Sequence, residues 1–205
     1  MFKYLLMSVG IALVVSLLIG VIHLFKVAQK NKKELSEYEN KEIVYSNNLG
    51  KVLVVYYSLS GNTKEIAENI AHKTNADLFE IKTTDKLNTN AKFYLEIKKQ
   101  LKSKKYPQIE ENIPDFSKYD TIFVGFPVWW YTIATPVLSF LEKADFNGKK
   151  VVAFSTQGSN FGTSFTDFEQ MAKNAKIAKG NSFNNVDKKY ARAVDNKIST
   201  WLNEL

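Results

Sequence analysis

A strand–turn–helix pattern at residues 51–69 constrains the fold more than any other part of the sequence. An apolar, β-branched run from Val52 to Tyr57 enters the small polar turn SLSGNT at residues 58–63, and a helical pattern follows at once. A buried strand that leads directly into a helix is typical of a parallel α/β sheet. The turn also predicts an anion site, because helical N–H groups, the helix dipole and hydroxyl donors converge there.

The residues around this turn predict its local geometry. Gly61 allows a positive φ or the close approach of a ligand. Asn62 precedes Glu65 by three residues. This spacing predicts Asn62 as the N-cap of a helix over residues 62–74, with the Glu65 side chain reaching back to it.

The rest of the chain alternates predicted strands and helices. Further strands are expected at residues 76–81, 119–125, 149–155 and 176–183, and further helices at 88–103, 137–143, 164–173 and 187–205. Thr135-Pro136 predicts an N-cap followed by proline at the first helical position. We therefore expect an α/β three-layer sandwich. Its five-stranded parallel sheet has the order 2-1-3-4-5, and helices cover both faces.

The N-terminal segment predicts a membrane anchor. Tyr4–Phe25 holds 22 residues without Asp, Glu, Lys or Arg. As a helix it is about 33 Å long, enough to cross a hydrocarbon core of about 30 Å. A cleaved signal peptide is the alternative, but its apolar core is normally only about 7–15 residues, and Lys26 occupies a position where cleavage needs a small residue. The expected organisation is a single-pass transmembrane anchor (1–27), a polar linker forming a stalk or helix extension (28–50), and a folded domain (51–205).

The charge distribution limits the possible partners. The net charge is +7, but five of the 28 basic residues precede Glu34, and all 21 acidic residues lie at or after Glu34. The part of the chain from Glu34 onward therefore has a net charge of +2. This near balance argues against a nucleic-acid partner. Lysines after the anchor favour a cytoplasmic domain under the positive-inside rule. Because exported signal anchors also begin with a short N-terminus and one lysine, the membrane side stays open.

Three loops are expected at the sheet edge where ligands bind, near the reversal of strand order between strands one and three. The first is the turn at 58–63. The second, FPVWWY at 126–131, carries two tryptophans and a tyrosine, and the third, TQGSNFG at 156–162, is small and polar. An anion cradle beside an aromatic slot suits a flat, phosphorylated heteroaromatic ligand.

On these motifs, the chain from Lys51 onward resembles the flavodoxin-like FMN-binding proteins, in particular a short-chain branch with SxSGNT after strand one and GxPxWW after strand three. The resemblance implies FMN as the cofactor, with its phosphate at the first turn and its isoalloxazine between the other two loops. The implied cofactor-binding residues are Ser58, Ser60, Gly61, Asn62, Thr63, Pro127, Val128, Trp129, Trp130, Tyr131, Thr156, Gln157, Gly158 and Phe161. Because Trp129 and Trp130 alternate in direction, one is expected in the core and one against the flavin.

The implied function is electron transfer by a membrane-anchored FMN protein without a separate catalytic side chain. Two alternatives remain: an NAD(P)H-dependent quinone, nitro or azo reductase, and a non-redox flavin-binding or membrane-scaffold module. The anchor favours a quinone or a membrane protein as redox partner. No metal site is predicted, because the chain has no cysteine, and its two histidines, His23 and His72, are not accompanied by acidic residues that would complete a metal site. The Gly-x-Gly-x-x-Gly pattern of dinucleotide-binding folds is also missing.

Overall fold

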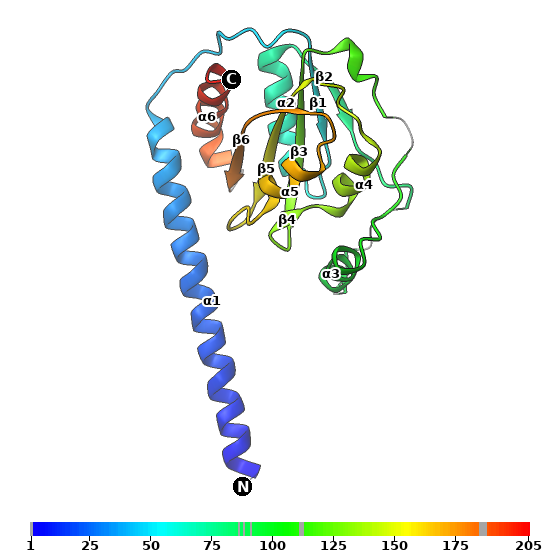
Figure 1. Ribbon diagram of the computed structural model, residues 1–205. Coiled ribbons are helices and arrows are strands. Elements are labelled where there is room, and N and C mark those ends of the chain that lie inside the picture. Colours follow the sequence, from blue (N-terminus) through cyan, green and yellow to red (C-terminus); the bar gives the residue numbers. More distant parts are fainter. Residues whose placement is uncertain (1, 86, 88, 91, 111–112, 185–187) are drawn as a thin grey trace.

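The computed structural model describes residues 2–85, 87, 89–90, 92–110, 113–184 and 188–205. A sheet is covered by helices on both faces, and one long helix projects from the domain (Figure 1). In chain order the elements are α1 (Phe2–Glu39), β1 (Val52–Tyr56), α2 (Asn62–Thr74), β2 (Asp77–Glu80), α3 (Phe93–Ser103), β3 (Thr121–Trp129), β4 (Thr132–Ile133), α4 (Thr135–Lys143), β5 (Lys150–Gln157), α5 (Ser164–Met171), β6 (Lys176–Asn184) and α6 (Ala191–Asn203). Short 3-10 helices precede β3 and α6.

The sheet has the strand order β2-β1-β3-β5-β6, and all neighbours along this path run parallel. This is the order 2-1-3-4-5 expected for five parallel strands, so the fold class is confirmed. The sequence did not predict β4, which pairs antiparallel with the end of β3. The segment 126–129, expected in a loop, belongs to β3, because that strand extends to Trp129.

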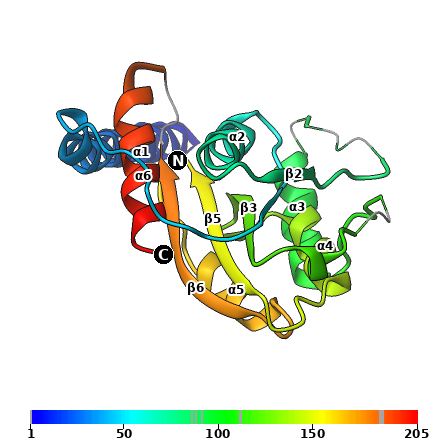
Figure 2. The ribbon, with the colours of Figure 1, turned by 90° about the horizontal axis from the view of Figure 1, so that it is seen from above.

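Two apolar layers hold the helices against the sheet. Leu53 and Val55 of β1 belong to the layer that includes Phe140 of α4, whereas Val54 belongs to the layer that includes Ile198 of α6. Figure 2 shows α2 and α6 on one face and α3, α4 and α5 on the other. Every residue of β1 is buried, as expected for a strand covered on both faces.

The helix caps differ from the prediction by one residue. Gly61, not Asn62, is the N-cap of α2; it has a left-handed backbone with φ of 95° and no side-chain cap. The Ser58 hydroxyl accepts the Gly61 N–H at 3.1 Å, so the turn closes one residue early. Similarly, Thr135 is the first residue of α4 rather than its cap. Its hydroxyl donates to Gln100 Oε1 at 2.8 Å.

Other boundaries shift by a few residues. The strand expected at 149–155 extends to Gln157, and the helix expected from residue 88 begins at Phe93. The C-terminal helix, expected from Asp187, begins at Ala191 after a 3-10 turn. Residues 88 and 187 themselves lie outside the described residues.

The polar segment after the apolar stretch packs on the domain. α1 continues through Glu39, and Leu35 is buried with residues of α6. The buried Lys197 ammonium donates to Glu34 Oε1 and to the Ser182 carbonyl, both at 2.5 Å. The Asn196 side chain donates to the Tyr38 carbonyl at 2.9 Å. The helix extension is therefore fixed along α6.

Candidate functional site

The turn after β1 presents a helix N-terminus to solvent. Ser60, Gly61 and Asn62 are exposed. A Cβ added at Gly61 would meet no atom within 4 Å, so the space beside this glycine is open. The first N–H groups of a helix have no intrahelical acceptor. The start of α2 therefore offers convergent donors together with the nearby hydroxyls of Ser58 and Ser60, which is the environment that an anion requires.

Thr63 has a different environment from its neighbours in the turn. It is 1% exposed, and its Oγ1 lies 2.7 Å from Oγ1 of Thr156, 93 residues away in sequence. This hydrogen bond joins the start of α2 to the end of β5. The first and third motifs are thus brought together, while the Thr63 hydroxyl is already paired within the protein.

The two adjacent tryptophans have opposite roles in packing. Trp129 is 7% exposed and makes edge-to-face contacts with Tyr57 and Phe93, at centroid distances of 5.7 and 5.2 Å. Trp130 is 42% exposed. Trp129 is therefore a core residue, and Trp130 is available to a ligand.

Trp130 and Tyr131 form the two-residue turn between β3 and β4. Both have positive φ, 51° and 64°, which a type I′ hairpin requires. Such a backbone costs about 1–2 kcal/mol per non-glycine residue, so contacts on either side must hold it. Trp130 Nε1 donates to the Tyr94 carbonyl at 2.8 Å, and the Tyr131 carbonyl accepts the Thr163 N–H at 2.8 Å. A Cβ at Gly162 would lie 2.1 Å from that carbonyl oxygen, so glycine permits this close approach.

The end of β5 carries a donor without a partner, although residues 156 and 157 were expected in a loop. The Ser155 hydroxyl donates to Gln157 Oε1 at 2.9 Å, which fixes the orientation of that amide. Gln157 Nε2 is buried and has no hydrogen-bond partner. Phe161 is half-exposed and contacts the Phe165 ring edge-on. A buried donor without a partner is costly, so an acceptor brought next to this nitrogen would stabilise the site.

A cavity of about 530 Å³ joins the second and third motifs. Five of the predicted cofactor-binding residues line it: Val128, Trp130, Tyr131, Gln157 and Gly158. The turn at 58–63 does not line the cavity, but the bond between Thr63 and Thr156 connects the turn to the end of β5, whose last residue, Gln157, does. Pro127 is half-buried next to Val128 in β3.

Ser159 and Asn160 of the third motif also line the cavity, although they were not among the predicted cofactor-binding residues. Outside the three motifs, sequence reasoning missed Tyr94 of α3, and His23 and Leu24 of α1. Tyr94 gave a weak signal as an aromatic residue on a predicted surface helix. His23 and Leu24 gave none, because their contact with the site depends on how α1 packs on α6.

Tyr57 lies behind the site, against Trp129. Burial, supported by the negative charge of Glu80, raises the pKa of Tyr57 to about 12. Its hydroxyl therefore stays protonated at physiological pH.

The profile of the flavodoxin family matches residues 51–205. The chain belongs to the flavodoxin family. The predicted resemblance is thereby confirmed. No curated protein matches the sequence.

Solved structures of other flavoproteins are similar to this chain. A flavoprotein from Lactobacillus acidophilus in complex with FMN has 27% identity and a TM-score of 0.59, covering 64% of this chain and 92% of its own. The apo-form of the flavoprotein from that organism has 28% identity and a TM-score of 0.53, and the match covers 71% of this chain and 98% of that protein. A presumed flavoprotein from Bacteroides eggerthii has 26% identity and a TM-score of 0.64, covering 75% and 96%.

Proposed function

We propose that this flavodoxin binds FMN at the carboxyl edge of its sheet and transfers electrons while α1 anchors it in a membrane. The observation that carries the proposal is the cavity of about 530 Å³, whose wall includes Gln157, a residue with an unpaired amide nitrogen. Its volume lies within the range of about 300–1,000 Å³ that is usual for cofactor sites. The solved FMN complex from L. acidophilus supports the choice of ligand.

The phosphate end of the site would be the exposed start of α2. Ser58, Ser60 and Asn62 supply polar side chains, and Gly61 leaves the approach open. The N–H groups of Asn62 and Thr63 point out of the first helical turn. The Thr63 hydroxyl bonds Thr156 and would position the turn rather than bind the phosphate directly.

The ring end would lie between the aromatic hairpin turn and the β5 loop. Trp130 and Tyr131 offer aromatic faces, and Gln157 Nε2 offers a donor to the ring edge. Pro127, Val128, Gly158 and Phe161 complete the walls, while the buried Trp129 and Thr156 support them. Bound FMN supplies the redox chemistry, and the protein supplies binding, orientation and hydrogen bonds.

The anchor in this proposal is α1. Its segment Gly10–Glu39 is a candidate membrane span, with a mean hydropathy of 2.4 over its most apolar window and none of that window buried. Among the described residues it is the one helix that is long and apolar enough to cross a membrane. Lysines after the apolar stretch favour a cytoplasmic domain. Carbonate extraction of membranes, with the mass of the mature chain, separates an uncleaved anchor from a cleaved signal.

Anaerobic spectroscopy of the FMN-loaded full-length protein in detergent micelles tests the electron-transfer function. We expect reduction by dithionite and rapid reoxidation by a quinone, with no turnover by NADH or NADPH alone. Steady NAD(P)H oxidation coupled to a quinone, nitro or azo compound would instead identify a reductase. Tightly bound FMN that accepts no electrons would identify a non-redox module. Both results would contradict the electron-carrier proposal.

A further inference from the structure

The cavity of the candidate site has one wall from the apolar helix. His23 and Leu24 line it opposite residues of the β3–β4 turn and the β5 loop. In sequence, His23 stands two residues before Phe25, where the charge-free stretch ends, and Lys26 follows. At about 1.5 Å rise per residue, His23 is only about 3 Å along the helix from that end. If Tyr4–Phe25 crosses the hydrocarbon, the cavity lies level with the headgroups.

The packing of α1 fixes this relation between helix and domain. Asn31 and Leu35 are buried, and the ion pair between Glu34 and Lys197 ties α1 to α6. These contacts extend over more than one turn of α1, so the direction of the helix relative to the sheet is set. Figure 1 shows α1 continuing past the end of the β6 arrow, with the N-terminus well beyond the sheet. The carboxyl edge of the sheet therefore faces the apolar part of the helix.

Exposed aromatic and aliphatic residues gather at the same edge. Trp130, Tyr131 and Phe161 are exposed on two of the site loops. On α3, whose Tyr94 lines the cavity, Leu95 is 67% exposed. Tryptophan and tyrosine side chains are enriched at the interface between membrane and water. The main apolar face of α3, with Phe93 and Ile97, packs in the core, so Tyr94 and Leu95 are the apolar residues that this helix exposes.

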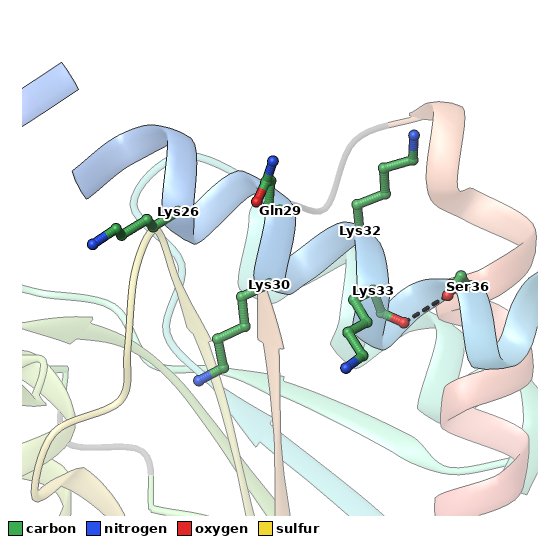
Figure 3. A pocket seen from close by; sticks show the side chains of 6 residues that line it. All are labelled: Lys26, Gln29, Lys30, Lys32, Lys33 and Ser36. Carbon is green, nitrogen blue, oxygen red and sulfur yellow. Dashed lines mark hydrogen bonds between the residues drawn. The ribbon is translucent and has the colours of Figure 1, made fainter. Parts of the chain in front are cut away.

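Lysines lie beside these residues, although Glu142 and Asp167 share a hollow with Trp130 on the side of α4 and α5. α3 carries three lysines and one acidic residue, Glu96. The Lys98 ammonium lies 4.9 Å from the centre of the Trp130 ring. On α1, the lysines that follow the apolar stretch spread outward in several directions (Figure 3). They are Lys26, Lys30, Lys32 and Lys33. Lysines near a membrane surface attract anionic headgroups by about 1 kcal/mol each.

We propose that the carboxyl edge of the sheet, with Trp130, Tyr131, Phe161 and α3, lies on the anionic bilayer in which α1 is inserted. The flavin site then opens toward the headgroup layer. This rests on the proposed function for the anchor and for FMN. A lipid surface is favoured over a protein partner because the apolar residues, the lysines and the end of the charge-free stretch lie at one level. A reactant dissolved in the bilayer reaches the site directly.

Tryptophan fluorescence of full-length protein in vesicles containing anionic lipid tests this orientation. Trp129 and Trp201 are 7% and 2% exposed, so Trp130 is the one exposed tryptophan. Lipids with a spin label near the headgroup should quench the wild type at least twofold more than Trp130→Phe. Deep labels should show a much smaller difference. Equal quenching of the two proteins by shallow labels would overturn the proposal.

A second probe does not depend on the Trp130 variant. The chain has no cysteine. Leu95→Cys on α3 and Lys118→Cys, in the 3-10 turn that precedes the amino end of β3, can therefore each carry one environment-sensitive dye. The dye at position 95 should shift to the blue on vesicles and be quenched by shallow labels, and the dye at 118 should not. Identical responses at both positions would contradict the docking.

The quenching is measured on the apoprotein, and FMN is then added to the same vesicles, so that FMN binding separates the two proposals. Bound FMN without position-specific quenching overturns the docking and leaves the proposed cofactor intact. Position-specific quenching without FMN binding supports the docking and contradicts the proposed function. Failure of the chain to float with vesicles overturns both the anchor and the docking.

Discussion

The hydrogen bond between Thr63 and Thr156 gives a sharp test of how the site is held together. Both side chains are buried, and their hydroxyl oxygens are 2.7 Å apart. Thr63→Val keeps the shape but leaves the Thr156 hydroxyl without this partner. We expect a loss of about 1–2 kcal/mol in the free energy of unfolding. For a domain of this size, that lowers Tm by about 2–8 °C.

The double variant provides the decisive comparison. Removing both hydroxyls leaves no unpaired group, so Thr63→Val with Thr156→Val should cost clearly less than the sum of the single changes. Thermal unfolding in detergent micelles, followed by tryptophan fluorescence in wild type and variants alike, measures each loss. Ser60→Ala, at an exposed position in the same turn, is the control. Strictly additive losses, or no loss in either single variant, would refute the reasoning.

Three further changes have defined outcomes. Gly61→Ala should destabilise the domain by about 1–2 kcal/mol because the φ of Gly61 is 95°, and it should also weaken FMN binding. Gly158→Ala is the control: its site has open space and no positive φ, so Tm should change little. Equal shifts in Tm for the two variants would contradict this prediction. Glu34→Ala removes the carboxylate from the buried Lys197 and should cost about 1.5–3 kcal/mol, with α1 then more open to limited proteolysis. Hydrogen bonds from Asn174 and Lys173 lower the pKa of Asp145 to about 2. Wild type should therefore be more stable than Asp145→Asn at neutral pH. Unfolding curves measured at different pH values should show this advantage disappearing between about pH 4 and 2.

Alternating apolar strands and amphipathic helices allowed the strand order to be predicted, because parallel connections permit few topologies. The β3–β4 hairpin was missed for a local reason. Its turn residues, Trp130 and Tyr131, take positive φ without the glycine or asparagine that usually signals a type I′ turn. Hydrogen bonds with Tyr94 and Thr163, which are distant in sequence, hold that turn, so the local sequence could not predict it.

The candidate site was foreseen in its parts rather than in its geometry. The three motifs were located at the carboxyl edge, but the sequence could not say which tryptophan is buried. That choice depends on the contacts of Trp129 with Tyr57 and Phe93. The wall contributed by His23 and Leu24 also had no local signal, because it follows from the packing of α1 on the last helix.

Cofactor binding by the full-length apoprotein tests the central claim most directly. Titration of FMN and of riboflavin, which lacks the phosphate, should be followed by quenching of flavin fluorescence. One FMN should bind per chain, at least tenfold more tightly than riboflavin, because the start of α2 holds the phosphate. Absence of FMN binding would contradict the flavin site, and equal affinity for both flavins would contradict the assignment of the turn at 58–63 to the phosphate.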